Sequence, residues 1–145
     1  MAILVNIVTA DEEEIEAVGE SQHPVEEWSG VEVRDFDTAK IATLHSLLVY
    51  DDYEEAFGAY EPVYVAMGDG AIVLRIPEVV TEKLALLEED ALERVGEELV
   101  ATEEFELSGW AVEEVQAFLL QLADLARLAE SQGQIMLAWM HPLRT

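Results

Sequence analysis

The stretch from Ser108 to Met140 constrains the fold of this chain more than any other part of the sequence. Between residues 112 and 129, apolar residues recur at spacings of three and four, which places them on one face of an α-helix. Gly133 follows this pattern, and glycine readily takes the left-handed conformation found at helix ends. The apolar run from Ile135 to Met140 then indicates a strand. The sequence therefore predicts a long helix over 111–131 followed by a final strand.

A second strong pattern lies near the middle of the chain, where two apolar runs flank Gly68-Asp69-Gly70. Asp-Gly sequences favour the tight turns of β-hairpins. The runs predict paired strands over 63–67 and 71–76. Because both runs are almost continuously apolar, we expect the hairpin to be covered on both faces. The same turn could offer backbone N–H groups to an anion, but a hairpin explains its composition more simply.

The remaining segments show strand and helix patterns in turn. A strand is predicted over 2–8, and residues 31–36 are predicted to form a second strand or an extended lead-in to the next helix. Helices are predicted to begin near Thr9 or Asp11, and near Asp37, Pro77 and Asp90, the last running to about Glu104. No repeat, low-complexity tract or linker divides the sequence, so residues 1–145 are expected to form a single domain. We expect an α+β fold in which helices pack on a small, mostly antiparallel sheet with a central hairpin.

The charge of the chain excludes several classes of partner. There are 32 Asp and Glu residues against 7 Lys and Arg, which gives a net charge of −25. A folded chain of this size then carries about one net negative charge per 300 Å² of surface. Nucleic acid and anionic lipid are poor partners for such a surface, because phosphate binding needs clustered basic side chains. A basic protein is the favoured partner.

The same composition bounds the cellular location. The sequence has no cysteine, which excludes disulfides and thiolate metal sites. No run approaches the roughly 18 apolar residues of a membrane-spanning helix. The first residues lack the basic segment of a signal peptide. These features predict a cytoplasmic protein without a membrane partner.

Several short motifs resemble those of an uncharacterised group of small bacterial proteins. They are Ala101-Thr102-Glu103-Glu104-Phe105, Gly109-Trp110, Glu113-Glu114-Val115 and Leu137-Ala138-Trp139-Met140. In the first half, Asp35-Phe36-Asp37 followed by Leu44-His45-Ser46-Leu47-Leu48 resembles the YfbM-like family, whose function is unknown. These resemblances imply a compact α+β domain in a bacterial cytoplasm, and they carry no catalytic residue over to this chain.

His45 is the strongest catalytic candidate among the titratable residues. It shares a predicted helix face with Leu44 and Leu48, and Asp35 and Tyr50 lie near enough in sequence to be its partners. A structural histidine that is hydrogen-bonded within the core is the simpler interpretation. The motifs of phosphate-binding loops, zinc proteases and α/β-hydrolases are missing. The three histidines lack metal-ligand spacing, so neither a metal nor another cofactor is predicted.

Two leucines of the long predicted helix lie well off its main apolar stripe. These are Leu120 and Leu128. They either contact another helix of the same chain or form an interaction patch for a partner, such as the second copy in a homodimer.

Three functions remain open from the sequence. The first is a non-enzymatic acidic interaction protein that binds a basic protein, as an immunity protein or a nucleic-acid mimic does. The second is a domain of unknown role whose acidity reflects a saline habitat. The third is a small hydrolase or binding enzyme centred on His45. We rank them in this order, because the net charge is the strongest signal and no catalytic motif accompanies it.

Overall fold

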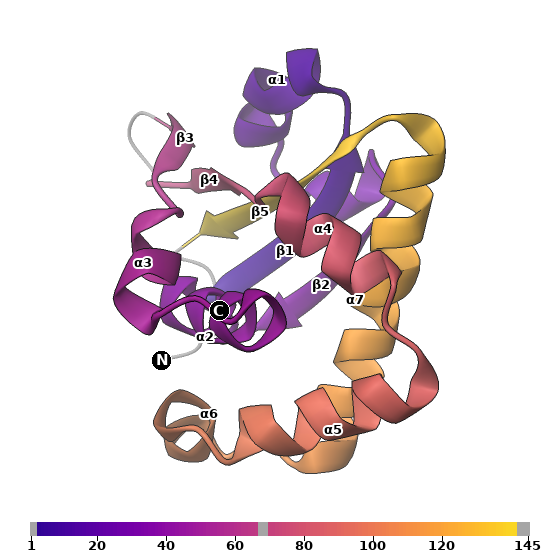
Figure 1. The fold of residues 1–145 in the computed structure, drawn as a ribbon. Helices are drawn as coiled ribbons and strands as arrows, with labels where there is room; N and C mark the ends of the chain where they lie inside the picture. The colour runs from indigo at the N-terminus through magenta and orange to yellow at the C-terminus, as the bar shows by residue number, and fades with distance from the viewer. Residues whose placement is uncertain (1–2, 67–69, 142–145) are drawn as a thin grey trace.

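The computed structural model describes residues 3–66 and 70–141, and in these ranges the chain has an α+β fold (Figure 1). The strands are β1 Leu4–Ala10, β2 Gly30–Arg34, β3 Pro62–Val65, β4 Ile72–Arg75 and β5 Ile135–His141. The α-helices of the described residues are α1 Ile15–Glu20, α2 Thr38–Val49, α3 Tyr53–Gly58, α4 Glu78–Ala85, α5 Glu89–Val100, α6 Glu103–Ser108 and α7 Val112–Gln132. Two short 3-10 helices, η1 Glu12–Glu14 and η2 Pro24–Glu26, flank α1.

The strands form one sheet in the order β2-β1-β5-β4-β3, with every neighbouring pair antiparallel. The predicted final strand is confirmed. It takes the central position because β5 pairs with β1 on one side, from Leu4↔His141 to Ala10↔Ile135, and with β4 on the other. The β3–β4 hairpin therefore lies at one edge of the sheet rather than at its centre, as Figure 1 shows. Gly68 and Asp69 of the expected turn lie outside the described residues.

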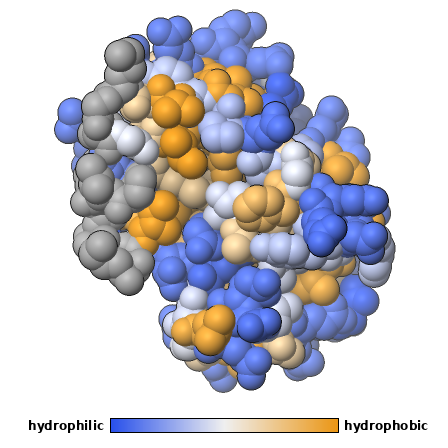
Figure 2. All heavy atoms as spheres, turned by 90° about the vertical axis from the view of Figure 1, so that its left-hand side faces the viewer, coloured by the Kyte–Doolittle hydropathy of each residue, from blue (hydrophilic) through white to orange (hydrophobic). Residues whose placement is uncertain are grey.

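The outer strand of the hairpin is more exposed than the sequence suggested. Of the two hairpin strands, β4 is covered on both faces, whereas Val63 and Val65 of β3 face solvent. Figure 2 views the side of the molecule that carries α3 and β3, and apolar atoms gather there among hydrophilic ones. Pro62 lacks an N–H group, and the pairing register shifts between Pro62 and Tyr64. Both features limit the pairing of a further strand with β3.

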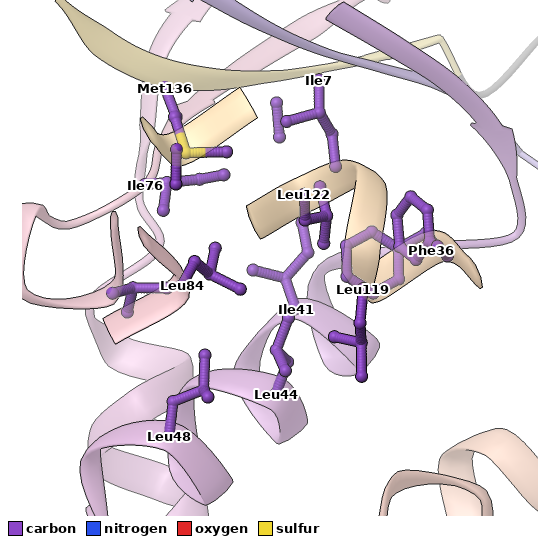
Figure 3. Close-up of a cluster of buried hydrophobic side chains, with 14 of the residues drawn as sticks. Ile7, Phe36, Ile41, Leu44, Leu48, Ile76, Leu84, Leu119, Leu122 and Met136 are labelled. Carbon is purple, nitrogen blue, oxygen red and sulfur yellow. The ribbon is translucent and has the colours of Figure 1, made fainter. Parts of the chain in front are cut away.

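One face of the sheet is covered by α2, α4 and α7, and the main core lies between these helices and the sheet (Figure 3). The labelled side chains are Ile7, Phe36, Ile41, Leu44, Leu48, Ile76, Leu84, Leu119, Leu122 and Met136. The predicted long helix is confirmed as α7, which ends at Gly133 in the left-handed conformation with a φ of 67°. Its apolar stripe spans this core, so α7 organises the packing of the elements that precede it.

The opposite face of the sheet is covered by α1 and η2. Trp139 is buried there with Leu4 and Val8, whereas Met136 of the same strand lies in the main core. Gly19 of α1 has a packing role on this side, because a Cβ atom at Gly19 would lie 2.1 Å from Cδ1 of the Tyr64 ring. The glycine lets α1 sit directly over β3.

The helix predicted from Asp90 to about Glu104 is divided in the structure. The break lies between α5 and α6, where Thr102 has extended backbone angles and occupies the N-cap position of α6. Its hydroxyl donates a hydrogen bond to the Leu99 carbonyl at 2.6 Å, so it competes for the backbone groups that would continue α5. Phe105 of α6 is buried and packs edge-on against Trp110, which fixes α6 to the start of α7.

Candidate functional site

His45 is enclosed by the helix that carries it and by the chain segment that follows. Asp37 begins α2 by accepting a hydrogen bond from the Lys40 backbone N–H at 3.1 Å, and the apolar face of the helix then turns His45 inward. Only 3% of His45 is exposed. Its Nε2 lies 2.9 Å from a carboxylate oxygen of Asp51, and its Nδ1 lies 3.1 Å from the Tyr60 hydroxyl.

These partners differ from the two that the sequence suggested. Asp35 forms an ion pair with Lys40, and Tyr50 is exposed. Tyr50 ends α2 in the left-handed conformation with a φ of 63°, which turns the chain back so that Asp51 reaches His45. No sequence pattern marks Tyr60, which joins the group through the packing of α3 against α2.

The three side chains form a hydrogen-bonded row from the surface to the interior. A carboxylate only accepts, so His45 donates its Nε2 proton to Asp51. When the imidazole carries only that proton, Nδ1 accepts from the Tyr60 hydroxyl. Burial raises the pKa of Tyr60, which keeps the hydroxyl protonated as this arrangement requires. A carboxylate, a histidine and a hydroxyl in this order can activate a nucleophile. Here, however, the hydroxyl is on a residue with only 5% exposure, so a substrate has no access to it in this conformation.

Replacing Tyr60 by Phe should lower the free energy of unfolding by about 1–3 kcal/mol at neutral pH, because His45 Nδ1 loses its buried hydrogen-bond partner. The variant should also change the alkaline behaviour. Above pH 10 the unfolded chain releases the Tyr60 proton while the folded chain keeps it, so the stability of the unchanged protein falls as the pH rises. Tyr60→Phe should reduce this fall. Urea unfolding between pH 7 and 11 measures both effects.

Tyr50→Phe is the matched control for Tyr60→Phe, because the Tyr50 side chain is exposed. Its stability should match that of the unchanged protein at neutral pH. An equal loss in the two variants would contradict the role given to the buried hydroxyl.

Lys40 forms a second buried polar cluster, which the sequence did not indicate. Only 4% of this residue is exposed. Its Nζ lies 3.6 Å from Asp35, 4.0 Å from Asp37 and 6.0 Å from the centre of the Phe105 ring. Asp35 has a φ of 65°, so the β2–α2 connection is held in a left-handed conformation beside the lysine. The cluster joins the start of α2 to α6.

His23 and Arg75 also have partners within the protein. His23 contacts Glu32 and lies 3.4 Å from Glu26. Arg75 forms an ion pair with Glu12 at 2.6 Å. Across residues 3–66 and 70–141, no group of three or more His, Cys, Asp or Glu side chains is placed to hold a metal ion.

The two leucines off the main stripe of α7 have different surroundings. Leu128 is partly buried and packs against the main core. Leu120 is 52% exposed and lines a groove of about 520 Å³ between α5 and α7. Leu87 and Leu92 supply the rest of its leucine side chains. The sequence allowed either a contact within the chain or a patch for a partner. Leu128 makes the contact within the chain, and Leu120 lies on an open surface.

Arg127 closes one end of this groove. Its guanidinium donates hydrogen bonds to the carbonyls of Ala85 at 3.0 Å and Leu87 at 2.7 Å, and a third to Asp124 at 3.1 Å. The carbonyls at the end of α4 are groups that a helix leaves unpaired, and a cation is favourable there. Arg127 therefore fixes the α4–α5 connection to α7.

Comparison with known proteins adds no assignment to this geometry: no family model, curated protein or solved structure matches the chain. Among the described residues, every helix is too short or too polar to cross a bilayer.

Proposed function

We propose that this chain is a non-enzymatic interaction protein whose acidic surface binds a basic protein, in the manner of an immunity protein or a nucleic-acid mimic. The observation that supports this proposal is the exposure of the negative charge. All described Asp and Glu side chains, which are all but Asp69 of the 32, are at least partly accessible to solvent. The field of such a surface attracts a cationic partner and accelerates its association.

The basic side chains do little to offset this field. Lys40 is buried between two carboxylates, and Arg75 and Arg127 are engaged by Glu12 and Asp124. The remaining Lys and Arg residues of the described chain are Arg34, Lys83 and Arg94. Among the residues that the structure describes, most carboxylates therefore have no ion pair with Lys or Arg, and a partner that brings such side chains would supply it.

The two alternative functions have less support. The enzyme hypothesis required His45 at the wall of an accessible pocket. His45 is instead buried, and its bonds to Asp51 and Tyr60 tie α2 to the segments on either side of α3. The saline-habitat hypothesis explains the charge without a partner and is tested by salt-dependent folding, described below.

The proposal is tested by calorimetry with two basic probes at 0.15 M NaCl: a histone-like DNA-binding protein and a basic nuclease. We expect at least one to bind with a Kd of about 1 µM or tighter, with affinity that falls steeply as salt rises, and to release duplex DNA when this protein is added. Polyglutamate of the same net charge is the matched control. If neither probe binds this protein more tightly than it binds polyglutamate, the proposal is wrong.

A further inference from the structure

The groove between α5 and α7 combines apolar walls with an acidic rim. Leu120 is 52% exposed and faces the same groove as Leu87 and Leu92. The rim residues of α5 and its N-cap are Glu88, Glu89 and Glu93, all exposed. Leu87 is buried and Leu92 is partly buried, so Leu120 is the leucine that the groove leaves open to solvent beside the carboxylates. An apolar side chain exposed next to a polar rim is a common feature of sites that bind another protein.

Both ends of the groove are held in place. At one end Arg127 binds the carbonyls of Ala85 and Leu87. At the other, the Gln116 side chain donates a hydrogen bond to the Glu93 carbonyl at 3.1 Å. Gly96 permits this close approach, because a Cβ atom there would lie 2.5 Å from Cγ of Gln116. The two helices are thus fixed with the groove open between them, and a ligand would meet a largely preformed site.

The charges around the groove select a cationic ligand. Glu89 and Glu93 are four residues apart and share one face of α5, and exposed Glu97 continues that row by another turn. Arg127 is the basic residue of the lining, and its donors are already engaged by Asp124 and two carbonyls. Lys or Arg side chains of a ligand would therefore find several unpaired carboxylates along one wall.

The walls also indicate the conformation of the ligand. Both are helices, whose backbone groups are bonded within each helix. At the edge of a sheet, an extended segment finds a row of backbone partners. The groove offers no such row, whereas a helical ligand satisfies its own backbone groups. A helix can place apolar anchors at spacings of three and four into a groove of this kind.

From these features we infer that the α5–α7 groove docks a basic amphipathic helix of a partner protein, with apolar side chains over Leu87, Leu92 and Leu120 and basic side chains beside Glu89 and Glu93. The inference rests on the proposed function and specifies the surface used. A second copy of this chain is a poorer occupant, since each copy carries a net charge of −25 and the two would repel.

The test uses two fluorescein-labelled peptides of 18 residues. One has Leu at positions that form a single helical stripe and Lys at the others. The second has the same composition in a scrambled order that removes the stripe. Fluorescence anisotropy at 0.15 M NaCl should show at least tenfold tighter binding of the amphipathic peptide. Leu120→Ser should weaken its binding about tenfold, and Glu89→Gln with Glu93→Gln should weaken it further.

Leu107→Ser is the matched control, because Leu107 is 81% exposed and lies on α6 outside the groove. It should leave peptide affinity unchanged. Circular dichroism and thermal unfolding of each variant verify that the fold is retained. Equal affinity for the two peptides, or equal effects of Leu120→Ser and Leu107→Ser, would overturn the groove assignment while leaving the calorimetric test with basic proteins unaffected. A concentration-dependent dimer that Leu120→Ser abolishes would also overturn it, since the occupant would then be a second copy.

Discussion

Replacing Leu122 by Ala should lower the free energy of unfolding by about 2–5 kcal/mol, the range for removal of a large side chain from a well-packed core. Leu122 is buried on the core face of α7 and lies among side chains from α2, α4 and β5 in Figure 3. Alanine removes the contacts among these elements and leaves a cavity that the surrounding helices cannot fully close. Urea unfolding at neutral pH measures the loss.

Gln121→Ala is the matched control for Leu122→Ala, because the neighbouring side chain is exposed on the same helix. Its effect should lie within about 0.5 kcal/mol. Similar losses in the two variants would mean that α7 does not present Leu122 to the core.

Raising the NaCl concentration from 0.01 to 1 M should increase the melting temperature by about 10 °C or more. A net charge of −25 confined to a folded domain repels itself more strongly than the same charge spread along an unfolded chain. The screening length falls from about 30 Å to about 3 Å over this range, so most of the repulsion disappears at high salt. Thermal unfolding followed by circular dichroism gives the melting temperature at each concentration.

A charge-reduced variant separates screening from other effects of salt. Glu13, Glu16 and Glu98 are exposed, and replacing all three by Gln leaves a net charge of −22. Repulsion scales with the square of the net charge, so the salt-dependent rise should shrink by about a quarter. If the melting temperature stays flat or falls as NaCl rises, repulsion among the exposed carboxylates does not destabilise the folded protein, and the premise is wrong. A chain that folds only in molar salt would favour the saline-habitat hypothesis over a basic partner.

The sequence by itself determined the helices and strands whose formation depends on residues close together in the chain. The helix of α7 follows from apolar spacing and from Gly133, both of which act within a few turns of the chain. The start of α2 follows from Asp37, whose carboxylate accepts from a backbone N–H three residues on. The hairpin strands were predicted for the same reason, since the two strands are close in sequence.

Only the tertiary structure decided where these elements meet. The sheet order places β5 beside β1, although more than 120 residues separate the two strands, and so moves the hairpin to an edge. The sequence places His45 on the apolar face of a helix and leaves both a catalytic and a structural role open, whereas Tyr60 becomes its partner only through the packing of α3 against α2. Leu120 and Leu128 share one helix and the same pattern in the sequence, yet α5 leaves a groove beside the first while the second packs on the core. Periodicity specifies the direction of a side chain from its own helix, and the neighbour that it meets depends on contacts between segments distant in sequence.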